Sequence, residues 1–428
     1  MTLRFALGWL ASIVCFITLA SAKLLFVNEV CRHGARAPEV DGSADQFPNG
    51  KGMLTASGMR QHYMIGHQLR KRYVSTQPDD DKLLSQKFKH DEVYVRSTQY
   101  PRTIQSAESQ MFGMYPLGSS NPLPAELIDV SVPPLEIHNK DEILKKLGTD
   151  PIPGRFQPIS IHNFGLYIDD MVAYGNCPYM VNDYVNRSKN PEIWQKYDKH
   201  FRPLIYKQIA AAFNITADDI DFQEIYPLSD ILWAEDFEGI QNRYNFTEKE
   251  WDIVKQIQLP CLVELLSDNS NKIMVSRMIN PVVEMMKSKI GLSYNQTLVS
   301  SFKKAKFLLF SSHDYQLSHI LKFLAPTNVN IKWIEYASIL LYELHSKDTA
   351  QCYGSKTKDC YIVKVFYNND QLKLPGCAKL DCTFSEFEAY IAAVGFDYKK
   401  IDEFCNSEES LPEAKNVKLF EPSNMFLD

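Results

Sequence analysis

The stretch VCRHGARAPE, Val30–Glu39, places Arg32, His33 and Arg36 within five positions of one another. It overlaps the end of the apolar run LLFVNEV, residues 24–30, which indicates a buried strand. Two permanent positive charges at this spacing repel each other. We therefore expect an anion to occupy the space between them, at the point where the strand ends.

The same pattern of an apolar strand followed by a polar turn occurs twice more. DEVYV precedes RSTQYPRT at residues 91–103, and KFLLFSS precedes HDYQ at residues 306–316. Short apolar strands that alternate with helices predict an α/β domain with a mostly parallel sheet flanked by helices. Ligands of such sheets bind beyond the carboxyl ends of the strands, so turns about 280 positions apart can form one pocket.

Each polar turn is followed by a predicted helix. Leu317, Ile320, Leu321 and Leu324 have helical spacing, and Pro326 ends this segment. Pro101 suits the first position of the helix after the second turn. Between the first two units, Thr55 is the expected N-cap of a helix that runs to about residue 73. Its apolar face is predicted to contain Met59, Tyr63, Gly66 and Leu69.

The middle of the chain differs from its two ends. Residues 141–299 look helical and irregular, and we interpret them as a cap inserted into a discontinuous α/β core of residues 23–140 and 300–428. Later in the chain, ILLYEL and CYIVKVFY predict a hairpin whose polar tip is bounded by Cys352 and Cys360.

The N-terminus and the cysteines indicate an exported protein. Residues 1–22 have one charge, Arg4, then an apolar stretch and an Ala-Ser-Ala cleavage signal, which together predict a signal peptide. No later segment approaches the length and apolarity of a membrane span, so the mature chain is expected to be soluble. Eight cysteines remain after Cys15 leaves with the leader, and an even number suits disulfides. Four glycosylation sequons fit the same route, at Asn186, Asn214, Asn245 and Asn295.

The net charge of the chain bears on which anions it can bind. The chain has a net charge of −6, which argues against nucleic acid as a partner. An anion site must therefore be a local concentration of arginine. Arg32, Arg36 and Arg96, brought together, would hold a phosphate dianion through their planar donor groups.

Two further residues of the polar turns are candidates for the nucleophile and the general acid. His33 can act as a covalent nucleophile toward phosphorus. Asp314, beside His313, is the candidate general acid for the leaving alcohol, and because it must carry a proton we expect activity at low pH. Gly34, which has no Cβ, is expected to let the backbone approach the anion. We expect no cofactor and no metal, since the arginines supply the positive field and no zinc or calcium motif occurs.

Several segments together resemble the histidine acid phosphatases, branch 2 of the histidine phosphatase superfamily. RHGARAP matches their RHGxRxP signature, and HD matches their proton-donor motif. LTASGMRQ and VRSTQYPRTIQSA resemble two further blocks, the second of which carries the family's third arginine. Two positions depart from the pattern, with Gln99 where the family often has Asp and Tyr315 where Thr is common.

The resemblance implies a fold and a set of roles. The fold would be a phosphoglycerate-mutase-like α/β domain with a smaller, mainly helical domain over the site. His33 would become a phosphohistidine and Asp314 would protonate the leaving group. The phosphate would be held by Arg32, Arg36, Arg96 and His313.

The cysteines resemble those of the animal prostatic and lysosomal acid phosphatases. That branch implies the pairs Cys177–Cys405, Cys352–Cys360 and Cys377–Cys382. Cys31 and Cys261 would remain, and we favour a free thiol at Cys31 over a bond between the two, because Cys31 precedes Arg32 on a buried strand. The resemblance also leaves a homodimer open. His62, His67, His319 and His345 are interpreted as core or surface residues without a catalytic role.

The sequence thus predicts an acid phosphatase acting on small-molecule or protein phosphomonoesters in a secreted, lysosomal or vacuolar setting. Two alternatives stay open. One is a phytase or inositol-phosphate phosphatase of the same superfamily, and the other is a secreted anion-binding glycoprotein that has lost catalysis.

Overall fold

The computed structural model describes residues 22–40, 46–77, 81–165, 168–172, 177–240 and 244–406. The predicted signal peptide therefore lies almost entirely outside the described residues. Within these ranges, no helix combines the length and the apolar character that crossing a bilayer requires.

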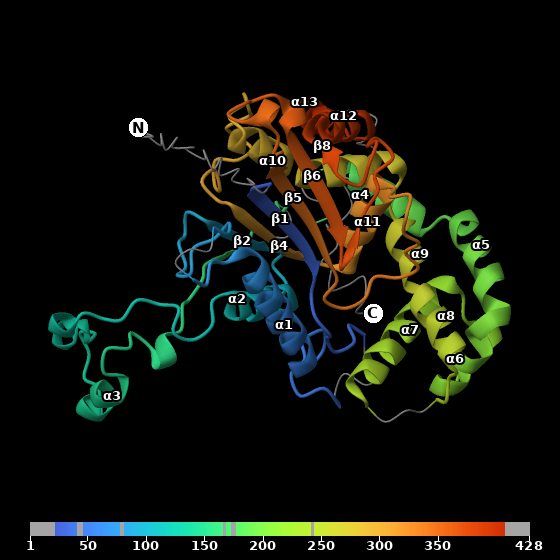
Figure 1. The fold of residues 1–428 in the computed structure, drawn as a ribbon. Coiled ribbons are helices and arrows are strands. Elements are labelled where there is room, and N and C mark those ends of the chain that lie inside the picture. Colours follow the sequence, from blue (N-terminus) through green and yellow to red (C-terminus); the bar gives the residue numbers. More distant parts are fainter. Residues whose placement is uncertain are drawn as a thin grey trace, which may run out of the picture.

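A mixed sheet forms the centre of the molecule (Figure 1). Its strand order is β3-β2-β4-β1-β5-β6-β7, and β8 pairs with β6. The four strands on one side of this order are parallel, whereas β5, β6 and β7 are antiparallel. The strands are β1 (Leu24–Arg32), β2 (Val93–Ser97), β3 (Ile161–His162), β4 (Phe307–Ser312), β5 (Ile339–Ser346), β6 (Tyr361–Tyr367), β7 (Asp370–Gln371) and β8 (Cys382–Thr383).

Helices cover both faces of this sheet because its central strands are apolar on both sides. Phe26 and Val30 of β1 belong to a core shared with α10 and α11, whereas Val27 and Cys31 face the core under α1 and α2. The helices are α1 (Ala56–Tyr73), α2 (Pro101–Met114), α3 (Lys140–Leu147), α4 (Pro178–Ser188), α5 (Pro191–Phe201), α6 (Lys207–Phe213), α7 (Phe222–Glu238), α8 (Glu248–Gln256), α9 (Gln258–Val263), α10 (Asp268–Lys289), α11 (Asp314–Leu324), α12 (Phe384–Val394) and α13 (Tyr398–Cys405).

The predicted α/β fold is confirmed. All three strand–turn–helix units form, and β1, β4 and β2 lie side by side in parallel. The predicted hairpin is β5 and β6, and the Cys352–Cys360 disulfide closes its polar tip. The antiparallel half of the sheet is larger than "mostly parallel" suggests, because this hairpin extends the sheet directly from β1.

The starts of the helices follow the expected capping chemistry. Thr55 accepts a hydrogen bond from the Gly58 amide at the start of α1, and α2 begins at Pro101. The predicted apolar face of α1 is correct at Gly66 and Leu69 and wrong at its first two positions. Met59 and Tyr63 are exposed, whereas His62 is fully buried. The apolar pattern misses this face because its central residue is a polar one that the interior satisfies by hydrogen bonds.

A separate helical cluster lies at one end of the sheet (Figure 1). Its core contains Trp194, Phe222 and Val254 and draws on helices α5 to α9. Helix α10, by contrast, packs in the core of the sheet. The division of the chain at residues 140/141 and 299/300 stays a prediction.

Residues 121–160 form an arm that extends away from the body, with α3 near its far end (Figure 1). Backbone hydrogen bonds join its two branches, including the Leu123 amide to the Thr149 carbonyl at 2.7 Å. None of these forty residues is buried. The arm therefore has no hydrophobic core of its own.

Candidate active site

The three polar turns meet at the carboxyl ends of β1, β4 and β2, as the sequence predicts. The His33 amide donates to the Ser312 carbonyl at 3.0 Å, and the Thr98 amide donates to the Ser311 carbonyl at 3.1 Å. The rings of His33 and His313 lie edge to face, 5.4 Å apart between centroids. Residues about 280 positions apart in sequence thus share one site, as expected for this kind of sheet.

His33 is almost completely buried, with 1% of its surface exposed. Its Nδ1 lies 2.8 Å from the Gly34 carbonyl oxygen. A carbonyl only accepts hydrogen bonds, so Nδ1 carries the proton and Nε2 keeps its lone pair. Burial holds the pKa of His33 well below its usual value, and the charges of Arg102, Arg32 and Arg36 lower it further. Both effects favour the uncharged form of the imidazole.

Gly34 has a packing role that the sequence did not indicate. A Cβ at this position would lie 2.4 Å from the Gly58 carbonyl oxygen, and a Cβ on Gly58 would lie 2.2 Å from the Ala35 carbonyl oxygen. The two glycines let the turn after β1 pack directly on the first turn of α1. This contact alone excludes a larger residue at Gly34.

Arg32 joins the site to its general-acid candidate. Its Nη2 lies 2.7 Å from Asp314 Oδ2, and its Nη1 donates to the Ile334 carbonyl. The guanidinium lies over the Tyr336 ring, 4.2 Å from the centroid, and 5.0 Å from that of Trp233. These contacts fix the plane of the donor group and hold Asp314 beside it.

Arg36 is held from the helical cluster. Its two terminal nitrogens donate to the two oxygens of Asp230 in α7, at 3.0 and 3.1 Å. Both side chains are buried. Two parallel hydrogen bonds of this kind fix the direction of a guanidinium as well as its position. The cluster of α5 to α9 is thereby connected to the turn that carries His33.

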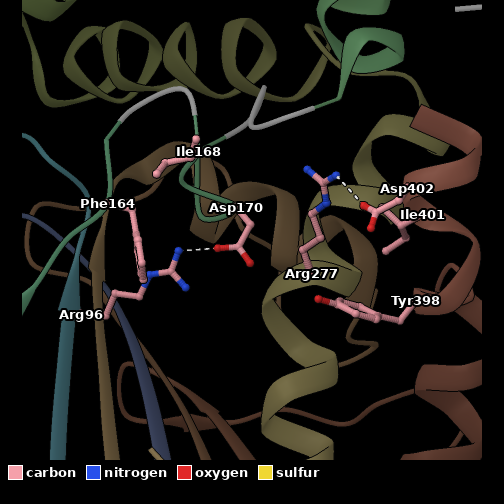
Figure 2. A pocket seen from close by; sticks show the side chains of 8 residues that line it. All are labelled: Arg96, Phe164, Ile168, Asp170, Arg277, Tyr398, Ile401 and Asp402. Carbon is pink, nitrogen blue, oxygen red and sulfur yellow. Dashed lines mark hydrogen bonds and ion pairs between the residues drawn. The ribbon is translucent and has the colours of Figure 1, made fainter. Parts of the chain in front are cut away.

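The prediction that Arg96 joins this group is corrected by the structure. Arg96 lies on β2 and pairs with Asp169 at 2.5 Å and with Asp170. Figure 2 shows it in a separate pocket of about 310 Å³, opposite Arg277 of α10 and Tyr398 of α13. Side chains alternate along a strand, so Arg96 shares the side of β2 that carries Tyr94, facing the α10 core.

Arg102 occupies the place expected for Arg96. It lies in the first turn of α2, pairs with Glu39, and has its Nη2 3.4 Å from His313 Nδ1. It is the charge with the largest lowering effect on the pKa of His33. Burial raises the pKa of Glu39, but the charges of Arg102 and Arg36 outweigh it and leave that pKa below its usual value. Glu39 is thus an anion beside Arg102.

His313 is oriented from both ring nitrogens. Guanidinium groups only donate hydrogen bonds, so Nδ1 accepts from Arg102 and Nε2 carries the proton. That proton points to Thr98 Oγ1, 3.0 Å away. Burial and then the charge of Arg102 hold the pKa of His313 well below its usual value. This ring is also neutral in the absence of an anion.

The site has buried donors that could bind an anion. The Nε–H groups of Arg32, Arg36 and Arg102 are buried and have no hydrogen-bond partner within the described part of the chain. Buried donors of this kind are rarely left unpaired. With a neutral imidazole between the arginines, the site offers positive charge and a lone pair to the same ligand.

Sequence reasoning missed several residues of the site. Arg102 stands in the quoted segment RSTQYPRT but was passed over in favour of Arg96, although its place after the strand was a usable signal. Glu39 is the last residue of the quoted stretch, and a carboxylate so close to two arginines could have been considered. Asp230, Trp233 and Tyr336 carry no motif and come together only through the fold.

The structure forms the three predicted disulfides, Cys177–Cys405, Cys352–Cys360 and Cys377–Cys382. Cys31 and Cys261 are buried free thiols, as predicted. The asparagines of all four sequons are exposed.

Comparison with known proteins gives consistent results. Residues 23–146 match the family described as "Histidine phosphatase superfamily (branch 2)". The chain is 25% identical to prostatic acid phosphatase of Homo sapiens over 402 residues, which cover 88% of this chain and 87% of that protein. It is 24% identical to lysosomal acid phosphatase of Xenopus laevis over 399 residues, covering 87% of this chain and 77% of that one.

Solved structures share the fold. A Hafnia alvei phytase in complex with myo-inositol hexakis sulphate has a TM-score of 0.58 and 14% identity, and the match covers 88% of this chain and 98% of that chain. A Bifidobacterium longum multiple inositol polyphosphate phosphatase has a TM-score of 0.53 and 11% identity, covering 89% and 94%. At these identities the likeness concerns the fold alone.

Proposed function

Because the chain is a branch 2 histidine phosphatase, distantly related to the prostatic and lysosomal acid phosphatases, we propose that it hydrolyses phosphate monoesters through a phosphohistidine at His33. One observation carries the proposal. The Nδ1 proton of His33 is bound to the Gly34 carbonyl, so the Nε2 lone pair is directed to a site bordered by three arginines.

In the first step, His33 Nε2 attacks phosphorus and forms a P–N bond while the P–O bond to the alcohol breaks. Asp314, protonated, gives its proton to the departing oxygen. Arg32, Arg36 and Arg102 donate hydrogen bonds to the phosphoryl oxygens. The ring of His313 also lies against the phosphate. Donors already fixed in place stabilise the charge that develops in transfer.

In the second step, water attacks the phosphohistidine. Asp314, now a carboxylate, accepts a proton from the water, and the P–N bond breaks to release inorganic phosphate. His33 returns to its neutral state and Asp314 to its protonated state. The atoms and protons therefore balance over one turnover.

The low pKa of His33 explains how such a site can work in acid. Donation by Asp314 requires acid, but an ordinary histidine would be protonated there and would lose its nucleophilic lone pair. Burial and the neighbouring arginines keep His33 neutral under the same conditions. We infer an acid pH optimum, because Asp314 must carry a proton in order to donate it.

The experiment is acid-quench trapping with a ³²P-labelled aryl phosphate, followed by mapping of the labelled residue. We expect label on His33, and none in His33→Ala. Full turnover by His33→Ala would contradict the proposal. Turnover of aryl phosphate from about pH 4 to pH 7 also separates an enzyme from an anion-binding protein. Comparison with inositol hexakisphosphate tests for a phytase.

We infer that the protein acts in a secretory, lysosomal or vacuolar lumen. Three disulfides and four exposed sequons support an oxidising route. The predicted leader at residues 1–22 would direct the chain into it. Loss of mass on treatment with an endoglycosidase, and retention inside the cell after deletion of residues 2–22, would test this route.

We also propose that the arm of residues 121–160 binds a second copy of this chain. Val130, Leu135 and Ile143 are exposed by 73%, 64% and 45%, and the arm encloses a mainly apolar hollow of about 240 Å³. Exposed apolar surface of this kind marks a binding surface. Leu135→Glu should shift the mass in solution from dimer to monomer, whereas Tyr353→Glu, on another exposed side chain, should not. A wild-type monomer would contradict the proposal.

A further inference from the structure

Three buried polar side chains form a row beneath the catalytic turn. Glu29 comes from β1, Gln110 from α2 and His62 from α1, and each has 0% of its surface exposed. Their surroundings are the apolar core of Val27, Cys31 and its neighbours on α1 and α2. No step of the proposed mechanism uses them, and a carboxyl group in such a core needs a physical explanation.

The row ends on the peptide bond that precedes the nucleophile. Gln110 Nε2 donates to Glu29 Oε2 at 2.7 Å, and Gln110 Oε1 lies 3.0 Å from His62 Nδ1. His62 Nε2 lies 3.0 Å from the Arg32 carbonyl oxygen. That carbonyl belongs to the same peptide unit as the His33 amide, which donates to Ser312. Both sides of the Arg32–His33 peptide are therefore held.

Two arrangements of protons satisfy these contacts. The Arg32 carbonyl only accepts, so His62 Nε2 carries a proton in both. In the ionised arrangement Glu29 is a carboxylate, and His62 donates through its second nitrogen to the amide oxygen. In the neutral arrangement Glu29 donates to the amide oxygen, and the amide nitrogen donates to His62 Nδ1. The structure places the amide in the first orientation, with Nε2 toward Glu29 and Oε1 toward His62, and a half-turn of the amide gives the second.

The surroundings favour the neutral arrangement. Glu29 Oε1 is buried and has no hydrogen-bond partner within the described residues, which is more costly for a carboxylate than for an acid. The titratable groups that face Glu29 are Cys31 of β1, His62 and Tyr73 of α1, and Glu343 of β5 through its contact with Tyr73. Arg72 of α1 supplies a positive charge nearby, but it pairs with Glu343 and is not among the groups that shift the pKa of Glu29.

The pKa directions agree with this arrangement. Burial raises the pKa of Glu29 to about 8, although the hydrogen bond with Gln110 opposes it. Burial lowers the pKa of His62 to about 4, although hydrogen bonds oppose this shift as well. Between these values, a protonated carboxyl group and a neutral imidazole coexist.

We propose that Glu29 is a neutral carboxylic acid and a positioning residue, which directs a one-way chain of hydrogen bonds through Gln110 and His62 to the Arg32 carbonyl and so fixes the peptide that carries His33. The role in phosphoryl transfer rests on the proposed function. The protonation state of Glu29 and His62 does not depend on the proposed function, and it is measured separately.

The first test is nitrogen NMR of the full chain with ¹⁵N-labelled histidine near pH 6. We expect His62 to have one protonated nitrogen, Nε2, and one acceptor nitrogen, Nδ1. Glu29→Gln should keep this pattern because its amide can donate to Gln110 as the acid does. Two protonated nitrogens in wild type would overturn the proposal. This result does not depend on any enzymatic activity.

The second test compares the stability of wild type and Glu29→Gln across pH. The raised pKa of Glu29 gives stability that is complete below its unfolded value of 4.5 and is lost as the pH rises through about 8. The ratio of the wild-type to the variant folding constant should fall about tenfold per unit between about pH 5 and pH 8. The contribution of His62 is common to both proteins. A ratio that stays constant with pH would overturn the proposal.

The third test separates positioning from simple packing. Glu29→Met keeps the length of the side chain but has no donor, so kcat should fall by between about tenfold and a hundredfold with little change in KM. Glu29→Gln should retain wild-type kcat. Equal activity of the Met and Gln variants would overturn the positioning role. If wild type forms no phosphohistidine, the proposed function is refuted. The NMR and stability results still decide the protonation state of Glu29.

Discussion

At the scale of single residues, the cations around His33 each have a carboxylate partner. The pairs are Arg32–Asp314, Arg36–Asp230 and Arg102–Glu39. A buried guanidinium without such a partner is strongly destabilising. The carboxylates also fix the direction of the remaining donors, so the site is arranged before an anion arrives.

The correction from Arg96 to Arg102 gives the first prediction. Arg102→Ala should lower kcat/KM for an aryl phosphate by about 10²- to 10³-fold, the cost of removing one fixed donor from a transition state. Arg96→Ala is the matched control, because it removes the same group from a separate pocket. It should change kcat/KM by less than about threefold. Steady-state kinetics at acid pH measure kcat/KM for both variants. A larger loss in the Arg96 variant would refute the assignment of Arg102 as the third phosphate-binding arginine.

The second prediction concerns Asp314. Asp314→Asn keeps the shape of the side chain but cannot give a proton to the leaving oxygen. The loss of kcat/KM should be about 10²- to 10⁴-fold for an alkyl phosphate, whose alkoxide leaves poorly. It should be smaller for a nitrophenyl ester, which leaves without protonation. An equal loss for both esters would show that Asp314 acts only by holding Arg32.

These residues show how far sequence reasoning reaches. The site residues at the ends of β1 and β4 lie where the polar turns predict: Arg32 is the last residue of β1, His33 and Arg36 follow it, and His313 and Asp314 follow β4. The prediction for Arg96 was wrong because this residue lies inside β2, one position before its end. The alternation of side chains along the strand directs Arg96 to the other face of the sheet. Asp230 could not be predicted, since its contact with Arg36 spans 194 positions and needs the packing of α7.

At the scale of elements, α7 links the helical cluster to the catalytic turn through Asp230. Asp230→Ala leaves a buried guanidinium without its carboxylate and should cost about 3 to 5 kcal/mol of stability. Phosphate should restore part of this loss, because an anion bound to Arg36 stabilises the folded state. Thermal unfolding with and without phosphate measures both effects. A smaller phosphate-dependent rise in Tm than in wild type would contradict this reading of Arg36.

The elements were predicted with uneven success, for physical reasons. The strand–turn–helix units and the hairpin have strong local patterns, and they form as expected. The predicted face of α1 differs from the observed one because His62 is buried. Its ring forms hydrogen bonds with Gln110 and the Arg32 carbonyl, and no local pattern indicates them. The arm was not predicted, because its apolar residues are exposed and resemble a core in sequence.

At the scale of the whole molecule, the Cys177–Cys405 disulfide joins the start of α4 to the end of α13. The bridge closes a loop with a sequence separation of 228 residues. The loss of chain entropy in the unfolded state predicts a stabilisation of about 5 kcal/mol. Cys177→Ser with Cys405→Ser should show this loss in denaturant unfolding. Removal of Cys377 and Cys382, which lie five positions apart, should cost less.

The position of β1 has a consequence for synthesis of the chain. Its neighbours on both sides are β4 and β5, and Val27 pairs with Phe307 and Glu343. A ribosome that adds about 5 to 20 residues per second therefore releases β1 roughly 15 to 60 s before either partner exists. Throughout that interval the nascent chain exposes an apolar segment that cannot yet pair. A chain truncated before residue 307 would lack both strands that pair with β1.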